Sequence, residues 1–334
     1  MFNKSLLLAA VVAVALITGI FIHYSHFWQP PPSPLPIVIL RFQTPHSGLI
    51  HIAQAKGYFT DEGLTVTYKT MQVGPEAIAR VLSGEADFAT TAETPVAMAL
   101  AEGKHPKFIA TIFSSRWSSG IVARKDHGVL TPEDLKGKRI GFVFGTNTQY
   151  DLETFLAFHN IPLDSITMVP GLPTELVAEL VSGKIDAASV WVPHMTNMQN
   201  QLGDNGVTFL RNEAYAQTIN IIVRPDYAAH HRKEIDRFLR ALYKAEIFTK
   251  EHSNEAYNII ASASGVDTSV LRGHGEPLTY ELTLKQSLLI ATENQVHWFF
   301  RRGLVPNGPF PDILDAFETE PLRAIKPTEV TISK

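Results

Sequence analysis

The chain of 334 residues carries a net charge of −4 at pH 7 and contains no cysteine. This length suffices for two medium-sized domains, and the charge gives no electrostatic reason to expect nucleic acid as a partner. Without cysteine there is no disulfide framework, no thiolate catalyst or thiolate metal site, and no attachment point for a lipid anchor.

The first 36 residues differ in character from the rest. Leu6–Ile22 is apolar and uncharged with Lys4 before it, which is typical of a signal peptide or of one membrane-spanning helix. No small-residue cleavage site follows, so we expect an uncleaved anchor in the inner membrane; the alternative is a cleaved signal peptide. The proline-rich residues 30–36 predict a stiff spacer. Residues 1–36 are therefore assigned to anchor and spacer, and all later residues to the periplasm.

Short apolar runs alternate with amphipathic segments from residue 37 onward. We predict strands at residues 37–42, 64–68, 87–90 and 139–144. Helices are predicted at residues 49–56, 75–82 and 95–102, and another after Thr148, which is a suitable N-cap. Strands that alternate with helices predict an α/β fold with mostly parallel sheets.

Two sequence patterns occur once in each half of the chain. Residues 83–89 and 182–188 both read S-G-x-x-D-x-A, which indicates an internal repeat. Ile121–Asp126 and Ile221–Asp226 are apolar runs that end in arginine, one residue and aspartate. We predict that they are two hinge strands between the halves, the alternative being ordinary strands with charged ends. Residues 320–334 are polar and predict a flexible tail.

Several segments, taken in order, resemble one known family. They are QAKGYFTDEGL at 54–64, SGEADF at 83–88, ETP at 93–95, TPEDLKGKR at 131–139 and SGKIDA at 182–187. They are similar to the periplasmic substrate-binding proteins of ABC importers, in the branch that serves nitrate, taurine and alkanesulfonates. The resemblance extends over residues 37–310.

The resemblance implies a bilobed α/β fold of the Venus-flytrap type, with two mostly parallel-sheet lobes joined by a two-strand hinge. Lobe 1 would comprise residues 37–121 and 225–319, and lobe 2 residues 122–224. The implied protein is a monomer without catalytic residues, metal or cofactor. It would capture a small anionic or zwitterionic molecule and present it to ABC permease and ATPase subunits. The alternatives are a membrane-tethered ligand-sensing module and a relative that binds or synthesises the thiamine pyrimidine precursor.

Two loops of lobe 1 are candidates for ligand binding, because the cleft of an α/β sheet lies outside the carboxyl ends of its strands. The first loop offers Thr44, His46 and Ser47. His46 would donate to an anion or stack on a ring; otherwise it is a surface histidine that caps a helix. The second loop offers Thr91 and Glu93. Glu93 would accept from a ligand amine, or it would stabilise the next helix N-terminus.

Two further loops complete the predicted site. Arg116 and Trp117 precede the second half, and a guanidinium there would match carboxylate or sulfonate oxygens; otherwise Arg116 is a surface residue beside a core tryptophan. The loop at 145–149 precedes a helix N-terminus, which attracts anions and small polar ligands. For Trp191 the alternative is a packed core residue. The binding candidates of lobe 2 are Thr146, Asn147, Thr148, Gln149, Trp191 and His194.

Overall fold

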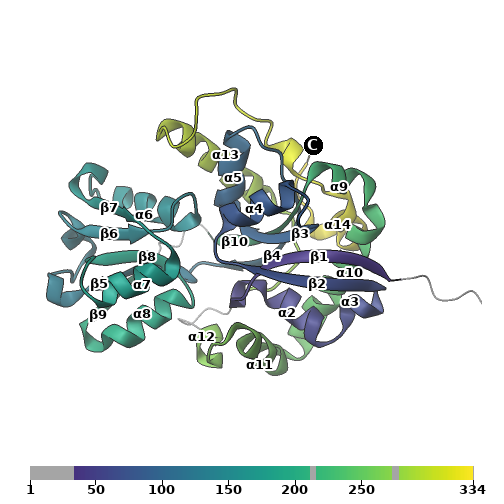
Figure 1. The fold of residues 1–334 in the computed structure, drawn as a ribbon, viewed down its shortest axis with the longest axis horizontal. Helices are drawn as coiled ribbons and strands as arrows, with labels where there is room; N and C mark the ends of the chain where they lie inside the picture. The colour runs from purple at the N-terminus through teal and green to yellow at the C-terminus, as the bar shows by residue number, and fades with distance from the viewer. Residues whose placement is uncertain (1–33, 211–215, 273–277, 334) are drawn as a thin grey trace, which may run out of the picture. The chain divides into compact units, whose positions relative to one another are not determined.

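Two five-stranded sheets, one in each lobe, organise residues 34–210, 216–272 and 278–333, which are the residues that the computed structural model describes (Figure 1). Residues 36–334 form one unit. Residues 1–33 of the predicted anchor and spacer lie outside the described residues. Among the described helices, none combines the length and the apolar character needed to cross a membrane.

The sheet of lobe 1 has the strand order β2-β1-β3-β10-β4. Strands β1 and β3 are parallel, whereas β10 is antiparallel to both β3 and β4. The strands are β1 (Leu35–Phe42), β2 (Leu64–Met71), β3 (Phe88–Ala92), β4 (Lys107–Ser115) and β10 (Gln217–Val223).

The sheet of lobe 2 has the strand order β7-β6-β8-β5-β9. Strand β6 is parallel to β7 and β8, and β5 is antiparallel to β8 and β9. Both sheets are therefore mixed, because each contains one strand that runs against its neighbours. The strands are β5 (Ser119–Arg124), β6 (Arg139–Phe142), β7 (Thr167–Pro170), β8 (Ala187–Trp191) and β9 (Gly206–Leu210).

The two sheets share one topology, and this corrects the predicted hinge. When β1 is matched with β6, the two strand orders coincide and β10 takes the position of β5. Ile121–Asp126 and Ile221–Asp226 resemble each other because both begin inside these equivalent strands and continue past their ends. The prediction that they form the hinge is wrong, because each strand pairs with two neighbours inside a sheet. The sequence does not distinguish the two cases, because a buried strand and a hinge strand share the same apolar pattern.

The chain instead passes between the sheets just before these strands. The first passage lies between Ser115 at the end of β4 and Ser119 at the start of β5. The second lies between Leu210 at the end of β9 and Gln217 at the start of β10, and includes residues 211–215 outside the described part. The predicted lobe 2 of residues 122–224 therefore wrongly included β10, which lies inside the sheet of lobe 1.

The repeated S-G-x-x-D-x-A pattern has the same structural role in both lobes. Asp87 Oδ2 accepts a hydrogen bond from the backbone N–H of Val38 in β1, at 2.9 Å. Asp186 Oδ2 accepts one from the backbone N–H of Arg139 in β6, at 2.7 Å. Each aspartate thus ties the loop before one strand to the start of its parallel neighbour, and this supports the repeat.

The helices of lobe 2 cover both faces of its sheet. The α6 residues Leu152, Phe155 and Leu156 pack into the apolar core of one face. On the other face, Gly141 of β6 lies against α7, where an added Cβ would come within 2.7 Å of Leu176 Cδ2. The N-cap of α6 is Thr146, two residues before the predicted one. The helices are α6 (Asn147–Phe158), α7 (Pro173–Val181) and α8 (His194–Leu202).

The helices of lobe 1 come from both ends of the chain. Helix α2 packs against α10 and α11, and α5 packs against α13 (Figure 1). They are α2 (Gly48–Ala55), α3 (Tyr58–Asp61), α4 (Gly74–Leu82), α5 (Glu93–Ala101), α9 (Pro225–His230), α10 (Arg232–Glu251), α11 (Ser253–Ser264), α12 (Thr268–Arg272), α13 (Gln286–Arg301) and α14 (Glu320–Ile325).

The C-terminal residues are ordered elements of lobe 1, so the prediction of a flexible tail is wrong. Helix α14 packs against α10. The side chains of Leu322, Val330 and Ile332 are buried, and the backbone N–H of Thr331 donates to Leu284 O at 3.0 Å. The sequence did not reveal this because the buried apolar residues are separated by polar ones and form no helical or alternating pattern.

Candidate ligand-binding site

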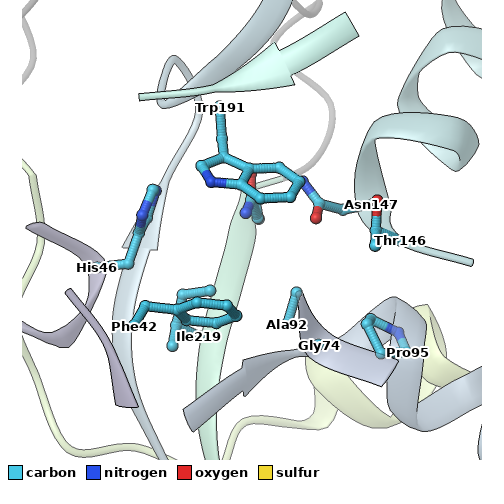
Figure 2. Close-up of a pocket in the computed structure, with 10 residues that line it drawn as sticks. Phe42, His46, Gly74, Ala92, Pro95, Thr146, Asn147, Trp191 and Ile219 are labelled. Atoms are coloured by element: carbon cyan, nitrogen blue, oxygen red, sulfur yellow. The ribbon is translucent and has the colours of Figure 1, made fainter. Parts of the chain in front are cut away.

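A small pocket with a cavity volume of about 20 Å³ lies between the two lobes. In Figure 2 Trp191 and Phe42 lie on opposite sides of the pocket, with His46 at one flank and Asn147 at the other. Ten residues line it and all are buried: Phe42, His46, Gly74, Ala92, Pro95, Gln217 and Ile219 of lobe 1, and Thr146, Asn147 and Trp191 of lobe 2.

The ends of strands place most of this lining. Phe42, Ala92 and Trp191 are the last residues of β1, β3 and β8, so their side chains lie at the carboxyl ends of parallel strands. Gln217 and Ile219 belong to the first residues of β10, which runs the opposite way and therefore begins at this same edge. The fold thus brings residues that are far apart in sequence to one pocket.

The N-terminus of α6 supplies the polar side of the pocket. Thr146 Oγ1 donates to Val143 O at 2.8 Å and accepts from the backbone N–H of Thr148 at 3.3 Å. Thr148 Oγ1 accepts from the backbone N–H of Val143 at 3.0 Å. The two hydroxyls therefore hold the loop itself, and Asn147 is left to face the pocket.

Three polar atoms of the lining lack a hydrogen-bond partner within the described part of the chain. They are His46 Nε2, Asn147 Nδ2 and Gln217 Oε1. A buried polar atom without a partner costs about 1–3 kcal/mol. A bound solute or ordered water that pairs with all three atoms would remove this cost, which makes the pocket a candidate site for a small polar ligand.

The lining carries no formal charge at neutral pH. None of the ten lining residues is Asp, Glu, Lys or Arg. Burial, with a smaller contribution from the nearby His194, lowers the pKa of His46 to about 3. His46 is therefore a neutral imidazole whose Nδ1 lies 3.0 Å from Thr44 Oγ1.

The remaining candidates of the first two loops lie beside the lining. Ser47 Oγ lies 3.4 Å from Thr90 Oγ1. Thr91 Oγ1 is buried next to Gly74, where an added Cβ would come within 2.6 Å of it. Glu93 is fully buried, and its Oε2 accepts from the backbone N–H of Thr218 at 3.1 Å and from Thr218 Oγ1 at 2.7 Å. Glu93 thus fixes the start of β10.

The turn between β4 and β5 does not bring a positive charge into the pocket. Arg116 is exposed and lies outside the lining, whereas Trp117 is buried in the same turn. The expected guanidinium clamp is therefore not part of this pocket, because the turn points Arg116 to solvent. His194 also lies outside the lining, with its ring centroid 6.2 Å from that of Trp191.

Gln149 belongs to a set of contacts that joins the lobes. Its Oε1 accepts from the backbone N–H of Gly145 at 3.0 Å, and its Nε2 lies 3.4 Å from Glu153 Oε1. Glu153 Oε2 in turn accepts from Trp298 Nε1 at 2.9 Å and from Arg302 Nε at 2.7 Å. A single carboxylate of lobe 2 thereby connects the pocket loop with α13 of lobe 1.

Six of the ten lining residues were not candidates from the sequence: Phe42, Gly74, Ala92, Pro95, Gln217 and Ile219. Phe42 and Ile219 look like ordinary strand residues, and Gln217 follows residues that fit no motif. A correct prediction that β10 begins at the edge where β1 and β3 end would have identified Gln217 as a lining residue. The hinge interpretation instead assigned this strand to lobe 2.

Comparison with known proteins identifies the family of the chain. A family model described as NMT1/THI5 like matches residues 43–256. The chain belongs to the NMT1/THI5-like family. A relative in this group is a putative aliphatic sulfonates-binding protein of Bacillus subtilis, 26% identical over 68% of this chain and 70% of its own length. Another is the taurine-binding periplasmic protein of Escherichia coli, 27% identical over 58% of this chain and 61% of its own.

Solved structures show the fold. The alkanesulfonate-binding protein SsuA from Xanthomonas axonopodis pv. citri matches with a TM-score of 0.73 and 18% identity, over 86% of this chain and 99% of that one. This confirms the bilobed periplasmic-binding-protein fold. The family model and the two relatives confirm the resemblance noted from the sequence. An enzyme is also similar: a 4-amino-5-hydroxymethyl-2-methylpyrimidine phosphate synthase of Schizosaccharomyces pombe is 26% identical over 61% of this chain and 62% of its own length.

Proposed function

We propose that this protein is the extracytoplasmic solute-binding component of an ABC uptake system. It captures one small polar molecule between its lobes and delivers that molecule unchanged to permease and ATPase subunits. The observation that carries the proposal is the pocket, which receives lining from both lobes and contains three buried polar atoms without partners. A solute would pair with these atoms only when both lobes surround it.

The names of the relatives support this function. Proteins named for aliphatic sulfonates and taurine are similar over more than half of the chain. Anionic or zwitterionic compounds of this kind are therefore the first candidates for the captured solute. The helix N-terminus at Thr146 and Asn147 suits such groups.

The periplasm is the proposed location, in agreement with the name of the taurine-binding relative. The apolar residues 6–22 would export the protein and, if they are retained, tether it to the inner membrane. Direct sequencing of the N-terminus of the exported protein tests the tether. A mature chain that begins with Met1 supports it, and one that begins at residues 23–30 shows cleavage instead.

A second candidate function is synthesis of a pyrimidine, which the similar fungal synthase suggests. Against it, the chain contains no cysteine, so it lacks the cluster of cysteine and histidine expected of such an enzyme. We therefore propose that the protein has no catalytic activity.

Ligand capture from a mixture tests the proposal. The full-length protein is incubated with a cell extract of small metabolites and washed, and the retained solute is released and identified by mass spectrometry. We expect one solute that binds again after purification and whose mass is unchanged after prolonged incubation with the protein. A chemically altered product would favour the enzyme, and no retained solute would contradict capture.

A further inference from the structure

We propose that lobe 1 carries a second ligand site, outside the pocket between the lobes, at which Arg41 binds the carboxylate or phosphate group of a small organic acid. The site is an open groove of about 760 Å³ between β1 and the helices α2 and α11 (Figure 1). The groove shares no lining residue with the pocket between the lobes. A ligand here would therefore be additional to the captured solute, and it does not depend on the proposed function.

Two neighbours fix the guanidinium of Arg41. Its Cζ lies 4.6 Å from the centre of the Tyr68 ring, and its Nη1 lies 2.7 Å from His51 Nδ1. His51 Nε2 lies 3.0 Å from Thr44 O, which can only accept, so Nε2 carries the proton and Nδ1 accepts from Arg41. Burial, with a smaller contribution from Arg41, lowers the pKa of His51 to about 4, so this imidazole is neutral at pH 7. Because uncharged groups already order Arg41, less conformational entropy is lost when a ligand binds to it.

The positive charge of Arg41 is not balanced within the described part of the chain. No carboxylate there forms an ion pair with Arg41, and Arg41 Nε is buried without a hydrogen-bond partner. Glu255 lines the same groove, but its Oε1 pairs with Lys56 Nζ at 3.1 Å. A half-buried cation without a counter-charge is stabilised by an anion that binds beside it.

Arg224 of the same lobe has a similar environment but also has carboxylate partners. It is half-buried like Arg41, and its Cζ lies 4.9 Å from the centre of the Tyr227 ring. Its Nη1 lies 3.4 Å from Asp87 Oδ1, and its Nε lies 3.1 Å from Asp226 Oδ2. At Arg41 the corresponding role of the carboxylates is left to a ligand.

The groove favours an oxyanion with a polar body. A guanidinium presents paired N–H groups that match the oxygens of a carboxylate or a phosphate. Other side chains of the groove are exposed and can donate and accept hydrogen bonds: Gln43, Gln54, Asn258 and Ser262. Hydroxyl groups on the ligand would bind to these side chains. A hydroxylated organic acid therefore fits the groove better than an apolar acid does.

Binding of two anions to the full-length protein at pH 7 tests the site. Inorganic phosphate and citrate are the anionic probes, glycerol is the uncharged probe, and sodium chloride keeps the ionic strength constant. Isothermal titration calorimetry measures the dissociation constant of each probe. We expect at least one anion to bind saturably and glycerol not to bind. No saturable binding of either anion would overturn the site.

Variants of the two arginines locate the bound anion. Arg41→Gln removes the charge and should weaken binding by about tenfold or more, whereas Arg41→Lys keeps the charge without the paired N–H groups and should weaken it less. Arg224→Gln is the matched control and should leave binding unchanged, because its carboxylate partners occupy the guanidinium. Equal losses in Arg41→Gln and Arg224→Gln would contradict the site.

A variant of the pocket between the lobes separates the two sites. Trp191→Leu alters the lining of that pocket and should leave binding of the anion in the groove unchanged. Loss of binding in Trp191→Leu, with binding retained in Arg41→Gln, would place the anion between the lobes and overturn the groove. That result would leave solute capture intact.

Asn258→Asp tests the groove without changing Arg41. Asn258 lies at an exposed position of α11 and lines the groove, so a carboxylate there should leave the fold intact. It should repel the anion or pair with Arg41 in its place, and weaken binding several-fold. An unchanged affinity in Asn258→Asp would overturn the site even if Arg41→Gln does not fold.

Discussion

The contact of Glu153 with α13 predicts that a single residue controls closure of the lobes. Glu153 lies in α6 of lobe 2, and its carboxylate accepts hydrogen bonds from Trp298 Nε1 at 2.9 Å and from Arg302 Nε at 2.7 Å, both in lobe 1. An open form would break both contacts, so they stabilise only the closed form. The substitution Glu153→Gln keeps the shape of the side chain and removes its charge.

The expected effect comes mainly from the tryptophan. A hydrogen bond to a charged group contributes about 1.5–3 kcal/mol when it is buried, as the one from Trp298 is. The side chain of Arg302 is 40% exposed, so solvent reduces its ion pair to about 0–1 kcal/mol. Because glutamine still accepts a hydrogen bond, we expect a net loss of about 1–2 kcal/mol. This corresponds to a dissociation constant about five- to thirtyfold higher.

Isothermal titration calorimetry on the wild type and the variant measures this effect with the tightest-binding solute. Glu246→Gln is the matched control, because Glu246 is also a buried, ion-paired glutamate, but its partners Lys250, Lys326 and Leu282 all lie within lobe 1. The control should lower the melting temperature and leave the dissociation constant unchanged. An unchanged dissociation constant in Glu153→Gln would refute the role of this contact in closure.

Three further predictions concern the pocket loop, the buried histidine and the C-terminus. Gly145 has φ +68° and lies where an added Cβ would be 2.6 Å from Met98 Sδ of lobe 1, so Gly145→Ala should weaken solute binding several-fold. The control is Gly303→Ala, at φ +62° with nothing within 4 Å of the added Cβ, which should leave solute binding unchanged. Equal losses of binding in both variants would refute the loop contact. The unfolded chain binds a proton on histidine near pH 6.5 and folded His46 only near 3, so the free energy of unfolding should fall as the pH drops through this window. Urea unfolding at pH 7 and 5 checks this, and a pH dependence unchanged in His46→Gln would contradict it. A chain that ends at residue 319 loses the buried Leu322, Val330 and Ile332, each contributing about 1.5–3 kcal/mol, so it should be unfolded by circular dichroism; a native melting curve would show the C-terminus to be dispensable.

The sequence predicted the fold class and the internal repeat well, because both depend on local patterns. Alternating apolar runs and amphipathic segments gave the α/β class, and the two S-G-x-x-D-x-A segments marked equivalent loops whose aspartates Asp87 and Asp186 bind equivalent strands. The position of β10 could not be predicted in this way. Its apolar pattern is the same whether it serves as a hinge or as an antiparallel strand inside the sheet, and only the pairing with β3 and β4 decides between the two.

The site was predicted in part for the same reason. His46, Thr146 and Asn147 were found because they follow predicted strands, Trp191 was also a candidate, and all four line the pocket. Whether they bind the solute is still a prediction. The direction of a side chain within a turn cannot be read from residue type, so Arg116 was expected in the pocket although its side chain is exposed.

The distance between the lobes tests most directly whether they close on a solute. Because the natural chain has no cysteine, spin labels can be attached at Leu130→Cys in lobe 2 and Ile290→Cys in lobe 1, both at exposed positions. Double electron–electron resonance should show a shorter and narrower distance distribution when the protein is saturated with the tightest-binding solute, and no such change in the Trp191→Leu variant at the same concentration. An identical distribution with and without bound solute would contradict capture by closure.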